Sequence, residues 1–449
     1  MQTIISNTSI EKTITLLKEK YSKIDDNGCF FAIVRTEYDE NGNNIHDFLE
    51  VIAVADKIGY DYINTIVYPS SVSQNVAFTD NVKYVVWLSK NRSHMKFLKD
   101  AIREKHIWKD VEWGKRSQNY NPKGKDPGNV WIPTEDDGNA KITKHILLDD
   151  AGVINRLLAM SECGNNYQIY ESNVKMQSLK FVPHIHKQIN DSIFNKVFFK
   201  SSENMCDIKD ESIKLVVTSP PYWNLKDYFK KGQIGQENYD TYLMRMKTVW
   251  SECYKKLSSE GSLWININIR VRDGKVIMIP LDFVKICEEI GYFYKGIVIW
   301  HKSSGIPTGN NNIVDRHEYV LIFSKSEKFS VNKDIFSSFS DYKNDKMNGR
   351  AFWNINRKAG SVGKKYIHPA IFPNGLVDRI IKISSFQRDT VIDPFLGSGT
   401  SLIAASLNNR SFIGYEYYEG FKELIQSRIK SEIPGTEVDF NFDGNSNKS

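Results

Sequence analysis

Residues 391–416, VIDPFLGSGTSLIAASLNNRSFIGYE, decide the fold of this chain. A short apolar run ends at Asp393, a glycine-bearing loop follows, SLIAASLNN has the composition of a helix, and FIGYE reads as the next strand. A strand, a glycine loop, a helix and a second strand form the first half of a doubly wound sheet. The stretch therefore predicts an α/β fold with a mostly parallel sheet.

The loop itself predicts a nucleoside site. Gly397 and Gly399 allow a tight turn and a close approach of the backbone to a ligand. Glu416 stands at the end of the next strand, where a carboxylate can accept both hydroxyl groups of a ribose. The loop has neither the longer glycine pattern of dinucleotide sites nor the Lys-Ser/Thr pair of a phosphate-binding loop, so both are poor fits.

A second motif lies upstream, in KLVVTSPPYWNLKDY at residues 214–228. A β-branched run meets two consecutive prolines, which cannot continue a strand because they lack the backbone N–H. Ligand sites of open α/β sheets lie outside the carboxyl ends of the parallel strands. We therefore expect TSPPYW and the glycine loop to open on the same edge of one sheet.

The chain also contains a collinear internal repeat. The matched segments are 59–68 with 291–300, 82–90 with 317–325, Trp131 with Trp353, and 145–161 with 368–384. We interpret this as a partial duplication whose first copy, roughly residues 10–162, lacks both motifs. The predicted organisation is a degenerate partial repeat with a recognition-type insert over 1–165, a catalytic domain over 166–435 with a recognition region near 326–360, and a flexible tail over 436–449.

Composition excludes several classes of protein. No apolar run is long enough for a membrane helix, and the N-terminus lacks a secretory pattern, so we expect a cytoplasmic protein without membrane contact. The five cysteines are scattered, which argues against a disulfide framework and against a metal site. Basic and aromatic residues alternate over 96–125 and 342–365, a mixture that suits phosphate contact and base stacking.

The two motifs together resemble those of the S-adenosylmethionine-dependent amino-methyltransferases of DNA, which modify N4 of cytosine or N6 of adenine. TSPPYW at 218–223 is similar to their catalytic motif, DPFLGSGT at 393–400 to their cofactor loop, and HPAIFPNGLVDRIIK at 368–382 to the helix over the methionine end. The catalytic motif precedes the cofactor loop, as in the circularly permuted β order of that family. The resemblance implies a doubly wound, Rossmann-like, circularly permuted sheet with an N-terminal degenerate half copy and inserted target-recognition regions.

The resemblance also implies the site residues. The hydroxyl of Ser219 and the carbonyl of Pro220 would accept hydrogens of the target amine, and Tyr222 would stack on the base. The catalytic set is Ser219, Pro220, Pro221 and Tyr222, and the cofactor-binding set is Asp393, Pro394, Phe395, Gly397, Ser398, Gly399, Thr400, Glu416 and His368.

Roles remain open for several flanking residues. Trp223 is either a pocket wall or core packing, and Asn224, Lys226 and Asp227 line the pocket or touch phosphate in one reading. His301 and Lys302, just past a predicted strand, are candidates to face DNA, with an exposed loop as the alternative.

The function implied is transfer of a methyl group from S-adenosylmethionine to N4 of cytosine in duplex DNA after base flipping, as the modification enzyme of a restriction–modification system. N6-adenine methylation, methylation of RNA or protein, and DNA binding without catalysis stay open as alternatives. We expect one active site in a monomer that acts as an internal pseudo-dimer. Duplex DNA is the expected partner, and a cognate restriction endonuclease is a further candidate.

Overall fold

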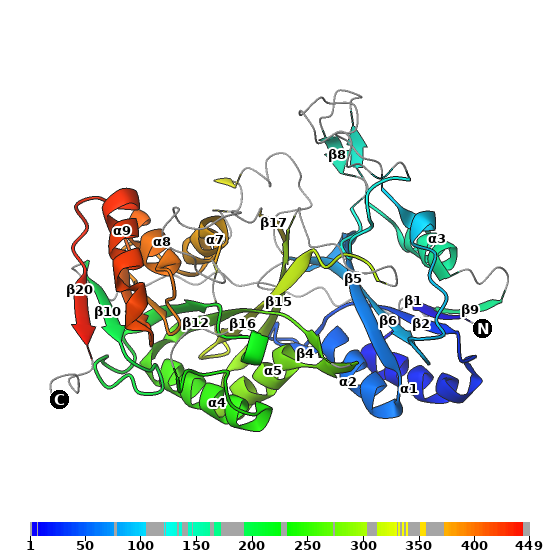
Figure 1. The fold of residues 1–449 in the computed structure, drawn as a ribbon, viewed down its shortest axis with the longest axis horizontal. Coiled ribbons are helices and arrows are strands. Elements are labelled where there is room, and N and C mark those ends of the chain that lie inside the picture. Colours follow the sequence, from blue (N-terminus) through cyan, green and yellow to red (C-terminus); the bar gives the residue numbers. More distant parts are fainter. Residues whose placement is uncertain are drawn as a thin grey trace.

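The structure is a computed structural model with two α/β units side by side (Figure 1). It describes residues 2–6, 8–75, 79–104, 121, 123–132, 134–136, 142–145, 147–161, 166–171, 193–225, 231–272, 274–302, 312–329, 331–332, 335, 338–339, 351–355 and 372–442.

The larger unit is built on a nine-stranded sheet. In spatial order its strands are β17 (Phe352–Asn354), β15 (Phe293–His301), β16 (His317–Ser324), β12 (Leu257–Ile267), β11 (Ile213–Thr218), β18 (Thr390–Asp393), β19 (Ser411–Tyr415), β10 (Asn195–Phe199) and β20 (Asp439–Phe442). Neighbouring strands run parallel except at β16, which is antiparallel to β12 and β15. The two predicted motifs follow adjacent parallel strands, β11 and β18.

Helices cover both faces of this sheet (Figure 1). One face carries α4 (Tyr239–Lys256) and α5 (Ile279–Ile290), and the other carries α7 (Asn374–Ser384), α8 (Thr400–Leu407) and α9 (Lys422–Glu432). Strand β11 is buried along its whole length, with Val216 in the cluster of α4 and α5 and Val217 in the cluster of α7 and α8. Burial on both faces explains why its sequence is almost continuously apolar instead of alternating.

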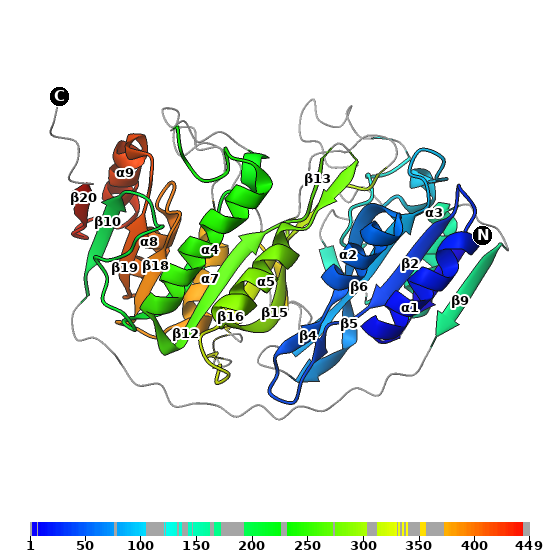
Figure 2. The same ribbon diagram turned by 90° about the horizontal axis from the view of Figure 1, so that it is seen from below.

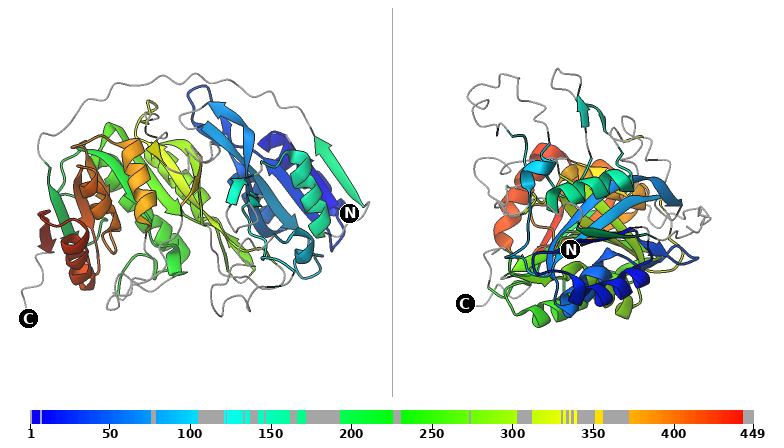
Figure 3. Two further views of the ribbon diagram at one scale, coloured as in Figure 1. Left: turned by 90° about the horizontal axis from the view of Figure 1, so that it is seen from above. Right: turned by 90° about the vertical axis from the view of Figure 1, so that its right-hand side faces the viewer.

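The smaller unit has a five-stranded sheet. Its order is β5 (Asp61–Asn75), β6 (Thr79–Ser89), β2 (Cys29–Val34), β1 (Gln2–Ser6) and β9 (Tyr167–Glu171). Helices α1 (Ile10–Lys20) and α2 (Phe48–Ile58) lie on one face and α3 (Asp150–Ser161) on the other, as the views in Figures 2 and 3 show. These five strands have the same spatial order and the same relative directions as five strands of the larger sheet, namely β15, β16, β12, β11 and β18.

The remaining elements are short. They are β3 (Glu37–Tyr38), β4 (Asn44–His46), β7 (Thr134–Asp136), β8 (Ile142–His145), β13 (Arg270–Arg272), β14 (Lys275–Ile277), and the 3-10 turns at Tyr21–Lys23, Lys99–Ile102, Trp223–Leu225 and Glu419–Phe421.

Matching side-chain contacts occur at equivalent places in both units. They are the edge-to-face pairs Tyr21–Tyr60 and Tyr254–Tyr292, both at 4.9 Å, and the guanidinium–indole contacts Arg156–Trp131 at 4.9 Å and Arg379–Trp353 at 5.3 Å. The internal repeat aligns these two tryptophans with each other and these two arginines with each other. The aligned residues therefore make the same contact in both units.

Two predicted boundaries are wrong. The first unit does not end at residue 165, because β9 pairs with β1 and belongs to the smaller sheet. The flexible tail does not begin at residue 436, because β20 pairs in parallel with β10. Phe440 and Phe442 stack on Phe199, with ring centroids 6.2 and 5.2 Å away, which supplies the apolar contact that holds this last strand.

The two units share one continuous hydrophobic cluster, in which residues of α1 and α2 pack together with residues of α5, β15 and β16. Phe48 contacts Tyr319 at 5.3 Å between ring centroids. Asp47 caps α2 by accepting from the Leu49 amide at 2.9 Å and also accepts from the Tyr294 hydroxyl of the other unit at 2.9 Å. Burial raises the pKa of Asp47 to about 6. The first unit is therefore packed against the second as part of one body.

This junction yields a stability prediction. Asp47→Ala should lower the free energy of unfolding by about 2–3 kcal/mol, because it removes a helix cap and leaves the buried Tyr294 hydroxyl unpaired. Ser9→Ala is the control, since Ser9 caps α1 through a solvent-exposed hydrogen bond and its loss should cost about 1 kcal/mol. Chemical denaturation of both variants measures the difference; equal losses would contradict a role of Asp47 between the units.

Candidate functional site

The carboxyl ends of β11 and β18 are joined by Asp393. Its carboxylate accepts from the Thr218 hydroxyl at 2.7 Å, the Ser401 hydroxyl at 2.5 Å and the Phe395 amide at 3.0 Å. Burial raises the pKa of Asp393 to about 6, although these three donors oppose the shift. Asp393 does not line the neighbouring cavity, so within the described residues it braces the strand ends and does not face a ligand.

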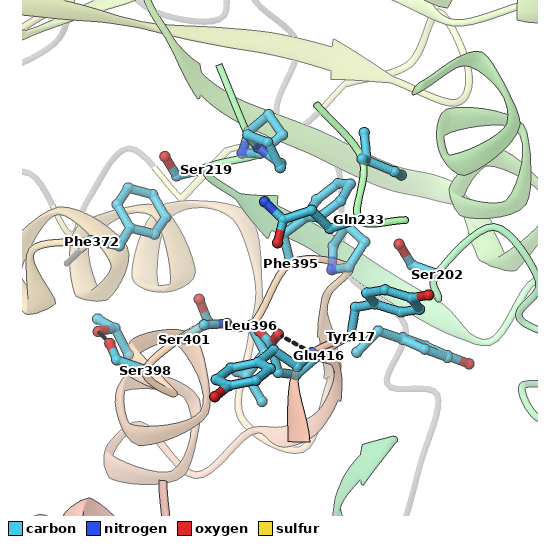
Figure 4. A pocket seen from close by; sticks show the side chains of 18 of the residues that line it. Ser202, Ser219, Gln233, Phe372, Phe395, Leu396, Ser398, Ser401, Glu416 and Tyr417 are labelled. Carbon is cyan, nitrogen blue, oxygen red and sulfur yellow. Dashed lines mark hydrogen bonds between the residues drawn. The ribbon is translucent and has the colours of Figure 1, made fainter. Parts of the chain in front are cut away.

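A cavity opens at this edge of the sheet, between the ends of β11, β18, β19 and β10. Figure 4 shows Ser219 on one side, Glu416 and Tyr417 on the other, and Phe395 between them. Both predicted motifs therefore contribute to one cavity, as the sequence predicted.

Glu416 lies half-buried directly after β19, on the floor of the cavity. Its two carboxylate oxygens accept from the amides of Gly397 at 2.8 Å and Tyr418 at 2.7 Å. Burial raises the pKa of Glu416 to about 7. A carboxylate has about four acceptor sites, so Glu416 can still accept from a hydroxyl group of a ligand.

The predicted cofactor residues fall into three groups. Those that line the cavity are Pro394, Phe395, Gly397, Ser398, Thr400 and Glu416. Asp393 and Gly399 stand behind it: Gly399 begins α8 in the left-handed conformation, at φ 83°, and an added Cβ would touch Ile425. His368 lies outside the described residues.

The predicted catalytic residues Ser219, Pro220, Pro221 and Tyr222 all line the cavity. The Tyr242 hydroxyl donates to the Pro221 carbonyl at 2.7 Å, which fixes the segment after the strand. The Tyr222 hydroxyl donates to Oε2 of Glu318 at 2.7 Å, so this ring is held by its far end.

Glu318 and Lys302 form a buried ion pair beside the cavity. Nζ of Lys302 donates to Oε1 of Glu318 at 2.9 Å. The Lys302 side chain is 8% exposed and the Glu318 side chain is 12% exposed. Burial alone would raise the pKa of Glu318, but Lys302 and the hydrogen-bond donors around it hold that pKa below its usual value. The idea that Lys302 faces DNA is therefore wrong; its charge is used inside the protein. His301 packs on the ring of Phe352 at 5.6 Å.

Trp223 does not line the cavity. Its indole N–H donates to the Glu237 carbonyl at 2.8 Å, and its ring meets Tyr239 edge to face, so local packing accounts for it. The Asn224 side chain accepts from Arg270 at 3.2 Å. Lys226 and Asp227 lie outside the described residues.

Some cavity residues were missed from the sequence. They include Lys200, Ser202, Asn266, Trp300, Glu318, Phe372 and Tyr415. Two of them carried a signal: Asn266 and Glu318 are polar residues in or beside runs that are otherwise apolar, at 263–267 and 319–323. A buried strand keeps a polar side chain only where that side chain has partners, so these positions could have been singled out.

Neither a membrane-spanning helix nor a metal site occurs in the part of the chain that the structure describes. No helix there is long and apolar enough to cross a membrane. No group of histidine, cysteine, aspartate or glutamate side chains in that part of the chain is arranged to hold a metal ion.

A family model matches most of this chain, and individual known proteins match about half of it. The family model described as DNA methylase matches residues 6–188 and 213–427. The type II methyltransferase M.Cfr9I of Citrobacter freundii is 30% identical over 254 residues, covering 49% of this chain and 82% of that protein. The type II methyltransferase M.MjaI of Methanocaldococcus jannaschii is 30% identical over 296 residues, covering 56% and 95%.

Among solved structures, a DNA modification methylase of Thermus thermophilus, TTHA0409, complexed with S-adenosyl-L-methionine, is 27% identical, covers 55% of this chain and 99% of its own, and has a TM-score of 0.43. The family model spans both units of the chain and both motifs of the cavity. The chain is a member of the DNA methylase family.

Proposed function

We propose that this DNA methyltransferase transfers the methyl group of S-adenosylmethionine to the N4 amine of a cytosine in duplex DNA. The observation that carries the proposal is that Ser219, Pro220 and Tyr222 line the same cavity as Glu416 and Gly397. Hydrogen-bond acceptors for an amine and a binding site for a nucleoside therefore lie at the same edge of the sheet.

The cavity fits an adenosyl cofactor. Glu416 offers its remaining acceptor capacity to the ribose, and the aromatic side chains of Phe372, Phe395 and Tyr418 can enclose an adenine ring. Bound there, S-adenosylmethionine would supply a methyl group already activated by the sulfonium sulfur.

The residues of the chain then act by positioning and electrostatics. An exocyclic amine is a poor nucleophile because its lone pair is delocalised into the ring. Ser219 Oγ and the Pro220 carbonyl can accept its two hydrogens, which favours a pyramidal nitrogen whose lone pair points at the methyl group. The methylated nitrogen is strongly acidic, so it can release its proton without a strong base.

The target amine is paired inside duplex DNA, so the base must leave the stack. Tyr222 offers a ring face for it at the wall of the cavity, and the hydrogen bond to Glu318 keeps that ring in place. This constraint lowers the entropy lost when the base is stacked.

The choice of cytosine rests on Ser219. In the family, serine before Pro-Pro favours N4-cytosine, and aspartate or asparagine favours N6-adenine. Mass spectrometry of nucleosides from treated DNA tests this choice: N4-methylcytosine supports it, and N6-methyladenine alone overturns it. Since several relatives are type II methyltransferases, we also infer that the enzyme protects DNA from a cognate endonuclease.

We further propose that the first unit is a partial duplicate that contributes a second DNA-contacting surface. Equal strand order and the recurring tyrosine and arginine–tryptophan contacts support a common origin. The basic and aromatic stretch at 96–125 belongs to this unit.

Ser219→Ala should lower kcat for methyl transfer by about 10²-fold, because a positioned acceptor for the amine is lost. Cofactor affinity should stay within about twofold of the wild type, since Ser219 lies away from Glu416. Ser212→Ala, at a half-buried serine before β11 and outside the cavity, is the control and should behave as the wild type. Filter assays with labelled cofactor and calorimetry measure both quantities; wild-type kcat in Ser219→Ala would refute the assignment.

Cofactor binding should depend on pH through Glu416. The ionised carboxylate is the form that accepts from the ribose, and its pKa is about 7. Below that pH a proton must first leave, so affinity should be about tenfold weaker at pH 6 than at pH 8. Calorimetry at both values tests this. Glu416→Gln should bind the cofactor weakly at both pH values and should lose most of the difference in affinity between them. An unchanged pH dependence of binding in that variant would assign the titration to another group.

The DNA contact of the first unit can be tested on the full chain. Photo-crosslinking to a duplex that contains the methylated site, followed by peptide mass spectrometry, should give adducts within residues 91–132 as well as near the cavity. Adducts confined to the second unit would mean that the first unit only supports it.

A further inference from the structure

Asn266, on β12, stands next to the catalytic serine at the wall of the cavity and is only 3% exposed. Its amide nitrogen Nδ2 donates to Oε2 of Glu318 at 2.8 Å and to the Tyr222 hydroxyl oxygen at 2.8 Å. The same nitrogen lies 3.5 Å from Oγ of Ser219. One N–H group is thus placed directly beside the predicted acceptor of the target amine.

The orientation of this amide is set by Glu318. An ionised carboxylate can only accept, so it must face the NH₂ group of Asn266 and not its carbonyl. The Lys302 ammonium, 2.9 Å from Oε1, favours the ionised state of Glu318. The carbonyl oxygen of Asn266 is buried with no hydrogen-bond partner within the described residues, yet turning the amide to relieve it would place this oxygen against the carboxylate. The donor therefore stays on the Ser219 side.

We propose that Ser219 and Asn266 read the N–C–NH₂ edge of the target base as a pair, an inference that rests on the proposed function. Ser219 accepts from the exocyclic amine, and Asn266 Nδ2 donates to the adjacent ring nitrogen, N3 in cytosine or N1 in adenine. Glu318 is the positioning residue that holds the donor in place.

The hydrogen bonds of this arrangement balance. Nδ2 has two hydrogens, of which one stays on Glu318 and the other moves from the Tyr222 oxygen to the ring nitrogen. The Tyr222 hydroxyl keeps its own donation to Glu318.

The same pair would reject bases with the reversed pattern. Thymine and guanine carry a carbonyl next to a ring N–H on this edge. The Ser219 hydroxyl can turn to donate to that carbonyl, but the ring N–H would face the Asn266 donor, and neither of these two N–H groups would have an acceptor. Mismatched buried groups of this kind discriminate strongly because neither partner is satisfied.

The test uses a duplex with the methylated site in which only the ring nitrogen of the target base is replaced by C–H. This base is 3-deazacytosine, or 1-deazaadenine if nucleoside analysis gives adenine. The readout is the ratio of kcat/KM for the normal and the deaza duplex, taken for wild type, Asn266→Ala and Glu318→Gln. Changes in amine reactivity caused by the analogue affect all enzymes alike and cancel when the ratios are compared.

The wild type should favour the normal base by roughly ten- to hundredfold more than Asn266→Ala does, because only the wild type has a donor to lose. Glu318→Gln should lose most of this preference too, since a glutamine can donate and lets Asn266 turn. Asn268→Ala is the matched control: its amide donates to the His317 carbonyl at 3.3 Å outside the cavity, and its ratio should equal that of the wild type.

Calorimetry of cofactor binding identifies any variant that fails to fold. If one of the two variants, Asn266→Ala or Glu318→Gln, fails to fold, the ratio measured for the other one tests the inference. Wild-type ratios in the folded variants would overturn this inference alone. Absence of methyl transfer to any DNA by the wild type would overturn the proposed function, and this inference with it.

Discussion

The structure depends on the pairing of two parallel strands, β11 and β18, whose ends are tied by the hydrogen bond from Thr218 to Asp393. The partners are 175 residues apart in the chain. Closing such a separation costs conformational entropy, and the apolar residues buried on both faces of β11 offset that cost. Once the strand ends meet, the Pro-Pro segment and the glycine loop must open on one cavity, since both follow the same edge.

Rigidity at this edge comes from polar groups that are buried together. Glu318, Lys302, Tyr222 and Asn266 are joined in a single network. A buried ion pair of this kind adds little to stability, because desolvation consumes most of its attraction. Its consequence is geometric: a charged acceptor imposes one orientation on each neighbouring donor. The active side of the cavity is thereby prepared before a base arrives, which is how positioning can replace stronger chemistry.

The sequence predicted the parts of the site that follow strand ends and missed those that lie inside strands. Ser219, Pro220 and the glycine loop are marked by residues that break regular structure, so their place at the sheet edge follows from local rules. Glu318 and Lys302 come from the antiparallel pair β15 and β16 and its continuation, and only their register brings the two side chains together. Asp393 was placed correctly at a strand end, but its three internal donors turn it away from the cavity. Local sequence predicts the position of a residue on its strand or loop, but it does not predict which distant residue its side chain will contact.

The first unit shows what the same scaffold does without the Pro-Pro segment. Strand register puts Ser6 at the place of Ser219, and the aligned segments put Lys83 at the place of Glu318.

There, Lys83 contacts Asp150 at 2.6 Å, and Asp150 also accepts from the Tyr68 hydroxyl at 2.8 Å and from the Ser6 hydroxyl at 3.4 Å. These groups satisfy one another at the position that corresponds to the Ser219 side of the cavity in the second unit. Opening it would leave a partly buried charge pair unpaired, a larger penalty than a stacked base could offset. The filled position is therefore a physical reason to expect one methyl-transfer site in each chain.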